Sequence, residues 1–519
     1  MKLRAGLLRA SSPWEQIFRQ EGFPFGIIDA HHFNPDEWSV LVINRVPDEH
    51  EALILSGYLR NGGGILSCGG FGQSVLGTGG ARARIEYITS HMGGLFEETG
   101  ILDVGAECMV SREANQLRTD SGNNALFAGE WRGGQVVELP FDPAELMCDS
   151  RSTLRQFYSA SERLPSENVS FVSKGELRSL FSRALEYLHH SRGLPYAHLW
   201  FFPEGAENCF AFRIDTDGAP QADVEDLYAV SREYEVPFSW YLDVKSHREW
   251  LRVFRAMQGQ EIGVHCFEHK TFELREENVA NMSRALELIK GEGMSASGFA
   301  APYGEWNPGL AAAIDESGFL YSSEFSYAFD SFPLYPEANG RRFAAVQVPI
   351  HPVCIGSMQR VGYTTEQMTK YFHRSVQMKL CRREPLFYYH HPAHRCFDVV
   401  KALLDAAHSS GIPAMTLGEF ARWWKIREGF TVDLETDGVS TRFAMRADAD
   451  PGTALWVEVT TKGGLARRVP LSTRSVSQGE GEWKSLCRES PPHDVRRTRE
   501  FDPRTRFAGW LNTILRKLR

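Results

Sequence analysis

An apolar run that ends in two acids and a glycine constrains the fold of this chain more than any other stretch. Residues 210–214, Phe-Ala-Phe-Arg-Ile, lead directly into Asp215, Thr216, Asp217 and Gly218. A buried strand of a parallel α/β fold has this pattern, because polar residues at its C-terminal end face the cleft where ligands bind. Asp215 and Asp217 are two positions apart, so on a strand their side chains point the same way.

A second stretch of the same design follows at residues 261–269. Its apolar centre, Ile-Gly-Val, leads to His265 and His269. One carboxylate and two imidazoles are a common ligand set for a catalytic divalent metal that keeps an open position for water. Two histidines four residues apart are weak evidence in a chain with 17 histidines, so the metal interpretation depends on its structural context.

The length of 519 residues is too great for one hydrophobic core, so several domains are expected. Strand–helix–strand patterning predicts a small doubly wound, flavodoxin-like α/β domain over 1–150, and helical spacing predicts a connector over 151–200. Alternating strands and helices over 201–427 favour a (β/α) barrel with its site at the C-terminal ends of the strands. Period-two runs separated by hairpin signals predict a small antiparallel β-domain over 428–490, followed by a basic tail over 491–519.

Composition excludes some functions. The net charge of −9 argues against a dedicated nucleic-acid binder, and the nine cysteines do not form a repeating disulfide framework. The first residues lack the apolar core of a signal peptide, and no run is long enough to span a bilayer, so a cytoplasmic protein is expected. The segment 504–519 has the spacing of a basic amphipathic helix. Such a helix can dock on its own protein or contact the inner face of the membrane peripherally.

Four short stretches occur in the order of the motifs of one enzyme family. They are Asp-Thr-Asp-Gly at 215–218, Gly-Val-His-Cys-Phe-Glu-His at 263–269, Gly-Phe-Ala-Ala-Pro-Tyr-Gly at 298–304 and Phe-Tyr-Tyr-His-His-Pro at 387–392. Over roughly residues 205–425 the chain therefore resembles the polysaccharide deacetylases, the family 4 carbohydrate esterases with the chitooligosaccharide deacetylase homology domain. The resemblance implies a barrel distorted from eight-fold closure.

The resemblance also implies a divalent metal, Zn²⁺ before others, held by Asp217, His265 and His269. It implies that the enzyme hydrolyses an N-acetyl group of an amino sugar in a polysaccharide or glycoconjugate precursor. In such a reaction Asp215, beside the metal and unligated, would take a proton from water as general base. The N-acetylated carbohydrate is the expected partner, and the sequence gives no indication of the oligomeric state.

Two further catalytic groups follow from this chemistry. The backbone N–H of Tyr303, which follows the supporting residue Pro302, would donate to the developing oxyanion. A histidine on the opposite wall would protonate the leaving nitrogen. His391 and His390 compete for this role, because adjacent residues of a strand face opposite ways. His391 is favoured, because the family's acid often precedes a proline.

The chain departs from the family pattern at one position. Ala300 occupies the place of an arginine that usually begins the third motif and orients the base. Arg213 is two residues before Asp215 on the same strand face, and it is a candidate substitute by parity alone. The fourth motif is blurred around Glu324, to which no role is assigned. Cys266, between the two histidines of its motif, would point away from them on a strand and is interpreted as structural.

The N-terminal region weakly resembles the non-catalytic relatives of class I glutamine amidotransferases. Cys68 lies where their nucleophile would, but Leu66 replaces the first glycine of the strained turn, so Cys68 is interpreted as structural. Two alternatives to a sugar deacetylase remain open. One is a metal-dependent hydrolase of another amide, such as a ureide or cyclic amide. The other is a catalytically weak carbohydrate-binding or assembly protein, which the alanine at position 300 would favour.

Overall fold

The computed structural model describes the chain except residues 92, 160–161, 447–454, 478 and 488–519. The predicted basic tail, with its amphipathic helix over 504–519, lies outside the described residues. The chain folds into two compact units. Unit 1 comprises Met1–Cys148, Lys174–Ala206 and the described residues from Lys425 onward, and unit 2 comprises Asp149–Ser173 and Glu207–Trp424.

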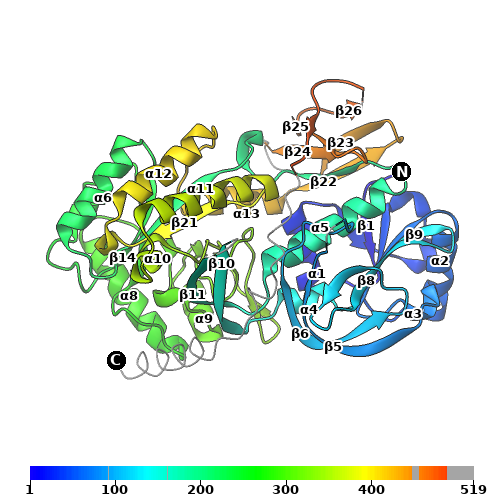
Figure 1. The fold of residues 1–519 in the computed structure, drawn as a ribbon, viewed down its shortest axis with the longest axis horizontal. Coiled ribbons are helices and arrows are strands. Elements are labelled where there is room, and N and C mark those ends of the chain that lie inside the picture. Colours follow the sequence, from blue (N-terminus) through cyan, green and yellow to red (C-terminus); the bar gives the residue numbers. More distant parts are fainter. Residues whose placement is uncertain (92, 160–161, 447–454, 478, 488–519) are drawn as a thin grey trace. The chain divides into compact units, whose positions relative to one another are not determined.

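A nine-stranded mixed sheet forms the centre of unit 1, in the strand order β2-β1-β3-β4-β9-β8-β7-β5-β6 (Figure 1). The first five strands of this order run parallel and the remaining pairs are antiparallel. The strands are β1 (Ala5–Leu7), β2 (Phe25–Ile27), β3 (Val40–Ile43), β4 (Gly64–Cys68), β5 (Gly80–Thr89), β6 (Leu102–Ser111), β7 (Gln116–Thr119), β8 (Asn124–Trp131) and β9 (Gly134–Leu139). The helices are α1 (Ser12–Glu21), α2 (Glu49–Arg60), α3 (Gln73–Leu76), α4 (Pro143–Met147) and α5 (Lys174–His190). All of β3 is buried, as expected for a central parallel strand.

The region predicted as a separate antiparallel β-domain is antiparallel but shares its pairing with other parts of unit 1. Strand β12 (Tyr196–Leu199) pairs with β24 (Trp456–Thr460), which continues to β25 (Leu465–Pro470) and β27 (Lys484–Ser485). A second small sheet consists of β22 (Thr431–Thr436), β23 (Ser440–Arg446) and β26 (Ser475–Ser477). The backbone N–H of Leu3 donates to the Leu434 carbonyl at 2.7 Å. These strands therefore complete unit 1.

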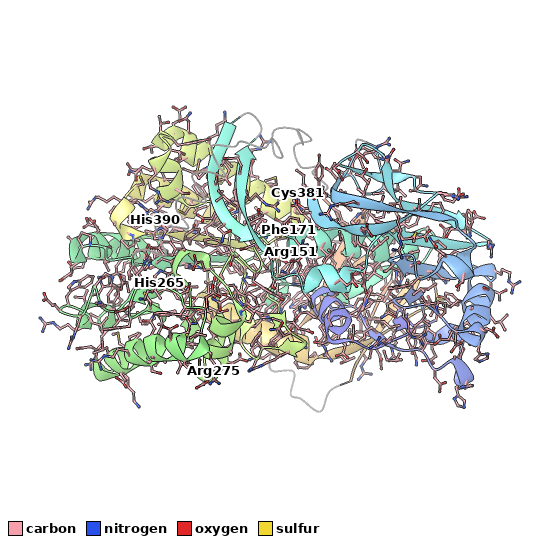
Figure 2. The ribbon with its side chains drawn as sticks, turned by 90° about the horizontal axis from the view of Figure 1, so that it is seen from below. Arg151, Phe171, His265, Arg275, Cys381 and His390 are labelled. Carbon is pink, nitrogen blue, oxygen red and sulfur yellow. The ribbon has the colours of Figure 1, made fainter. Side chains whose placement is uncertain are left out.

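The predicted helical connector over 151–200 is wrong in its first part. Strands β10 (Ser152–Ser159) and β11 (Glu162–Ser170) form an antiparallel hairpin that belongs to unit 2, and only α5 is helical. At the base of the hairpin the Arg151 guanidinium lies 4.4 Å from the centre of the Phe171 ring (Figure 2). The backbone N–H of Ser170 donates to the Phe325 carbonyl at 2.9 Å, which joins the hairpin to the loop after β17.

Seven parallel strands form the sheet of unit 2, in the order β20-β17-β16-β15-β14-β13-β21 (Figure 1). They are β13 (Phe210–Asp215), β14 (Phe238–Asp243), β15 (Glu261–Cys266), β16 (Gly298–Phe299), β17 (Tyr321–Ser322), β20 (Val346–Gln347) and β21 (Leu386–His390). Within the described part of the chain no pairing joins β20 to β21, so the sheet is an open half-barrel. A mixed α/β fold with a parallel barrel-like sheet, as predicted from the alternating pattern, is confirmed.

Helices surround this sheet (Figure 1). They are α6 (Gln221–Glu233), α7 (Arg252–Arg255), α8 (Arg275–Gly291), α9 (Pro308–Glu316), α10 (Ile355–Arg360), α11 (Thr365–Arg382), α12 (Phe397–Ser409) and α13 (Leu417–Gly429). Buried side chains of α6, α8, α11 and α12 join those of β13, β14 and β15 in one hydrophobic core. Among the described residues, no helix is both long enough and apolar enough to cross a bilayer.

Candidate metal centre and catalytic residues

The C-terminal ends of β13 and β15 carry the three predicted metal ligands. Asp217 follows β13 in a turn with φ of 37°, and Gly218 continues the turn at 67°. His265 lies within β15, and His269 lies in the loop that follows it. Because the strands are parallel, their C-terminal ends lie at one edge of the sheet, and the loops bring the three side chains together.

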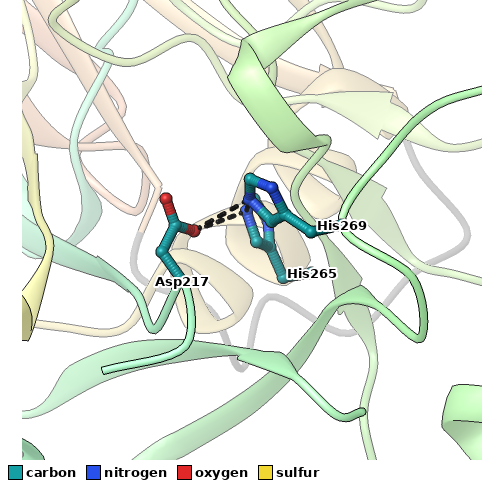
Figure 3. A group of neighbouring side chains, drawn as sticks. All are labelled: Asp217, His265 and His269. Atoms are coloured by element: carbon teal, nitrogen blue, oxygen red, sulfur yellow. Dashed lines mark hydrogen bonds and ion pairs between the residues drawn. The ribbon is translucent and has the colours of Figure 1, made fainter. Parts of the chain in front are cut away.

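The three side chains meet at one point (Figure 3). Asp217 Oδ1 lies 3.0 Å from His265 Nε2 and 3.1 Å from His269 Nε2. The two imidazole nitrogens are 3.1 Å apart. Together with the carboxylate oxygen they form the group of potential metal ligands found in the described part of the chain.

The donor atoms have the spacing and the protonation that a metal requires. His265 Nδ1 lies 2.7 Å from the Ala300 carbonyl, which can only accept, so Nδ1 carries the proton and Nε2 keeps its lone pair. Tetrahedral bonds of about 2.0–2.1 Å place neighbouring ligand atoms about 3.3 Å apart, close to the separations found here. Burial raises the pKa of the Asp217 carboxyl, but His391 and the hydrogen bonds of His265 and His269 outweigh it and hold this pKa well below its usual range. The donor set therefore fits a divalent cation such as Zn²⁺.

Asp215 lies at the end of β13 and is held by Arg213. The guanidinium donates from Nε to Oδ1 at 2.7 Å and from Nη2 to Oδ2 at 2.5 Å. Both side chains are buried, with 1% and 4% of their surface exposed. Burial alone would lower the pKa of His265, but the hydrogen bond to Asp217 and the negative charges of Asp215 and Asp217 raise it. Asp215 is thus an oriented carboxylate beside the ligand group and outside it.

The environment of Arg213 keeps the guanidinium in one orientation. Its Nη1 donates to the Ser323 carbonyl at 2.5 Å, and its Cζ lies 5.5 Å from the ring centres of both Tyr241 and Tyr389. Burial disfavours the charged guanidinium, but Asp215 more than compensates and raises the pKa of Arg213. The structure therefore holds Arg213 in one orientation against the Asp215 carboxylate.

His390 and His391 point in different directions. His391 Nε2 lies 3.4 Å from Asp217 Oδ2. His390 (Figure 2) is fully buried, and its Nε2 lies 2.9 Å from the Arg395 carbonyl. Burial lowers the pKa of His390 to about 3. Burial also acts to lower the pKa of His391, but the charge of Asp217 outweighs it, and the pKa of His391 is raised to about 9. Of this pair, His391 is thus the one whose protonated form its surroundings favour.

Tyr303 occupies the wall formed by the segment after β16. It lies in a short 3₁₀ turn, η4 (Pro302–Gly304), at φ of 60°, and its ring is 5.0 Å from the His269 ring. Pro302 is buried and begins this turn. A Cβ on Gly304 would lie 2.3 Å from the Phe325 ring, so the turn needs glycine there. The loop after β17 thus fixes the position of the Tyr303 backbone.

The two cysteines considered in the sequence take no part in the ligand group. Cys266 is buried, and its Sγ lies 4.0 Å from Asp243 Oδ1. Cys68 is fully buried in unit 1, and burial raises the pKa of its thiol well above the ordinary value. A buried thiol with a raised pKa is a poor nucleophile.

Several groups around the site have no role assigned by the sequence analysis. The Ala300 and Ser323 carbonyls that orient His265 and Arg213 belong to the backbone, so no residue type signals them. Thr216 ties the end of β13 to β14, and its position between two aspartates is the only available signal. Glu324 is fully buried and accepts a hydrogen bond from the Ser322 hydroxyl at 2.8 Å.

No protein-family model and no curated protein sequence matches the chain. Among solved structures, a protein assigned as a polysaccharide deacetylase from Mycobacterium smegmatis is 15% identical over 44% of this chain and 94% of its own, with a TM-score of 0.39. An allantoinase is 14% identical over 43% of this chain and 92% of its own, with a TM-score of 0.37. A family 4 carbohydrate esterase pseudoenzyme from Bacillus anthracis is 12% identical over 52% and 88%, with a TM-score of 0.31.

Proposed function

We propose that this chain is a metal-dependent hydrolase that removes N-acetyl groups from an amino sugar of a polysaccharide or glycoconjugate precursor. The observation that carries the proposal is the convergence of Asp217, His265 and His269 on one point, with all three donor atoms 3.0–3.1 Å apart. Asp215, whose charge acts on His265, and His391, 3.4 Å from Asp217, supply a base and an acid. Hydrolysis of an amide needs such a pair together with a means of polarising the carbonyl.

Asp217, His265 and His269 would hold the metal, most simply Zn²⁺. When bound, such a metal lowers the pKa of water and withdraws charge from a carbonyl oxygen. Asp215 takes the proton from the attacking water, and Arg213 keeps both oxygens of this carboxylate in place while it does so.

Two groups act on the other atoms of the amide. The Tyr303 N–H donates to the oxygen that gains negative charge, and loss of such a donor typically costs about 3 kcal/mol. His391, whose protonated form the neighbouring Asp217 favours despite burial, gives a proton to the departing nitrogen. His390, a neutral histidine bonded to a backbone carbonyl, has a structural role.

Acetate release from N-acetylated sugars tests the proposal. The purified chain, loaded with Zn²⁺ or Co²⁺, is assayed against N-acetylglucosamine oligosaccharides and against nucleotide-linked N-acetyl sugars. Metal-dependent release of acetate from either class supports the proposal. Release of product only from a ureide or a cyclic amide, tested in parallel, would keep the metal hydrolase and reject the sugar. A chain that binds metal and hydrolyses none of these amides would reject the activity.

A further inference from the structure

Asp217 adopts a backbone conformation that non-glycine residues rarely adopt. Its φ of 37° lies in the left-handed region, which costs free energy unless the surrounding structure enforces it. The residue before it, Thr216, is fully buried between the ends of β13 and β14. The contacts of Thr216 therefore decide how the turn that carries Asp217 begins.

Every polar group of Thr216 is hydrogen-bonded. Its backbone N–H and its hydroxyl both donate to the Tyr241 carbonyl, each at 3.1 Å. The hydroxyl also accepts from the backbone N–H of Asp243 at 2.9 Å. Its carbonyl accepts from the backbone N–H of Ala219 at 2.7 Å, which closes the turn around Asp217. The threonine side chain thus extends the pairing of β13 and β14 by one residue beyond the strands.

We infer that Thr216 is a positioning residue, whose hydroxyl holds Asp217 in the orientation that the metal requires. The inference rests on the proposed metal centre. Without the hydroxyl, the Asp243 N–H loses its acceptor in a buried environment. The end of β13 then loses both side-chain hydrogen bonds that connect it to β14. The carboxylate of Asp217 then samples positions away from His265 and His269. The expected consequence is weaker metal binding with little change in the rest of the fold.

Metal affinity measured on the full chain tests this inference. Zn²⁺ affinity is determined by competition with a chromogenic chelator, and Co²⁺ coordination by its visible absorption spectrum. Thr216→Val keeps the shape and removes the hydroxyl, and we expect a 10–100-fold loss of affinity, the range typical of groups that orient metal ligands. Thr216→Ser keeps the hydroxyl, so its affinity and Co²⁺ spectrum should stay close to those of the unaltered chain.

Thr416 offers a matched control in the same unit. Its hydroxyl donates to Glu419 Oε2 at 3.0 Å and accepts from the Glu419 backbone N–H at 3.1 Å, so it makes a similar pair of bonds. The adjacent Met415 N–H bonds to the carbonyl of Phe210, at the opposite end of β13 from the site. Thr416→Val should therefore lower thermal stability and leave metal affinity unchanged.

Three outcomes would overturn the inference. Equal metal affinity in Thr216→Val and the unaltered chain would show that the hydroxyl does not position Asp217. An equal loss in Thr216→Ser and Thr216→Val, or in Thr416→Val, would show that affinity follows general stability. An unaltered chain that binds neither Zn²⁺ nor Co²⁺ would instead reject the metal centre itself, and with it the inference.

Discussion

Arg213 holds both carboxylate oxygens of Asp215 from two residues earlier on the same strand, at 2.7 and 2.5 Å. The pair is buried, and the guanidinium is fixed further by the Ser323 carbonyl. Two-pronged pairing fixes the plane of the carboxylate as well as its charge. Arg213 thus lies on the same face of β13 as Asp215, where the parity of the strand places it.

Replacing Arg213 by methionine should destabilise the chain severely. The variant leaves Asp215 as a buried carboxylate without its partner, and breaking a buried pair in this way typically costs about 3–5 kcal/mol. Urea unfolding of the metal-free chain measures the loss. The double variant Arg213→Met, Asp215→Asn should recover part of it, because the unpaired charge is gone. Strictly additive losses would show that the two side chains do not interact.

Replacing Asp215 by asparagine should abolish turnover and leave metal binding intact. The amide keeps the size of the side chain but cannot take a proton, and general-base catalysis typically contributes about 10²–10⁴-fold. Acetate release and metal content are measured on the same preparation. Unchanged turnover would remove Asp215 as the base. Loss of metal together with turnover would place Asp215 among the ligands.

The two neighbouring histidines should respond differently to substitution by glutamine. His391→Gln removes the proton donor beside Asp217, so we expect a fall in kcat of about 10²–10⁴-fold. His390→Gln removes a buried bond to the Arg395 carbonyl and should lower stability with a smaller effect on kcat. Steady-state kinetics and thermal unfolding of both variants separate the roles. The reverse order of kcat values would make His390 the acid.

Glu324 should make stability depend on pH. Burial raises the pKa of its carboxyl to about 8 in the folded chain, whereas an unfolded glutamate has a pKa of about 4.3. Between these values the unfolded state has released a proton that the folded state keeps, so stability falls as pH rises through this window and levels off above it. Glu324→Gln keeps a partner for Ser322 and removes this ionisation.

The two stability curves should therefore diverge with pH. Relative to the unaltered chain, Glu324→Gln should gain up to about 1.4 kcal/mol of unfolding free energy per pH unit across the window. Urea unfolding between pH 4.5 and 8.5 is the measurement, with Glu316→Gln on the surface as the control. Parallel curves for the unaltered chain and Glu324→Gln would show that Glu324 is ionised in the folded state.

Local sequence patterns are sufficient to predict site residues that lie at the end of a single strand. Asp215, Asp217 and His265 were identified because apolar strands end in polar residues that must face the cleft. Bonds between distant segments were not predictable, since the Ala300 and Ser323 carbonyls become partners only when β16 and β17 line up beside β15. Every residue has a backbone carbonyl, so the residue type does not indicate which carbonyl will accept these hydrogen bonds.

The division of the chain into two units is harder to predict from the sequence, because tertiary contacts determine which strands pair. The hairpin β10–β11 lies between α4 and α5 in the sequence, and its strands do not alternate strictly between apolar and polar residues. The strands after residue 430 show clear alternation, but nothing in them indicates that β24 pairs with β12. Alternation predicts that a strand exists, and burial against other segments decides where it goes.

The metal content of the full chain and of three single variants tests the central claim most directly. After loading with Zn²⁺ and removal of free metal, elemental analysis of the unaltered chain should give one equivalent per chain. Asp217→Ala, His265→Ala and His269→Ala should each lose most of it, because each removes one of three ligands. An unaltered chain without bound metal, or variants that keep a full equivalent, would contradict a metal centre at these residues.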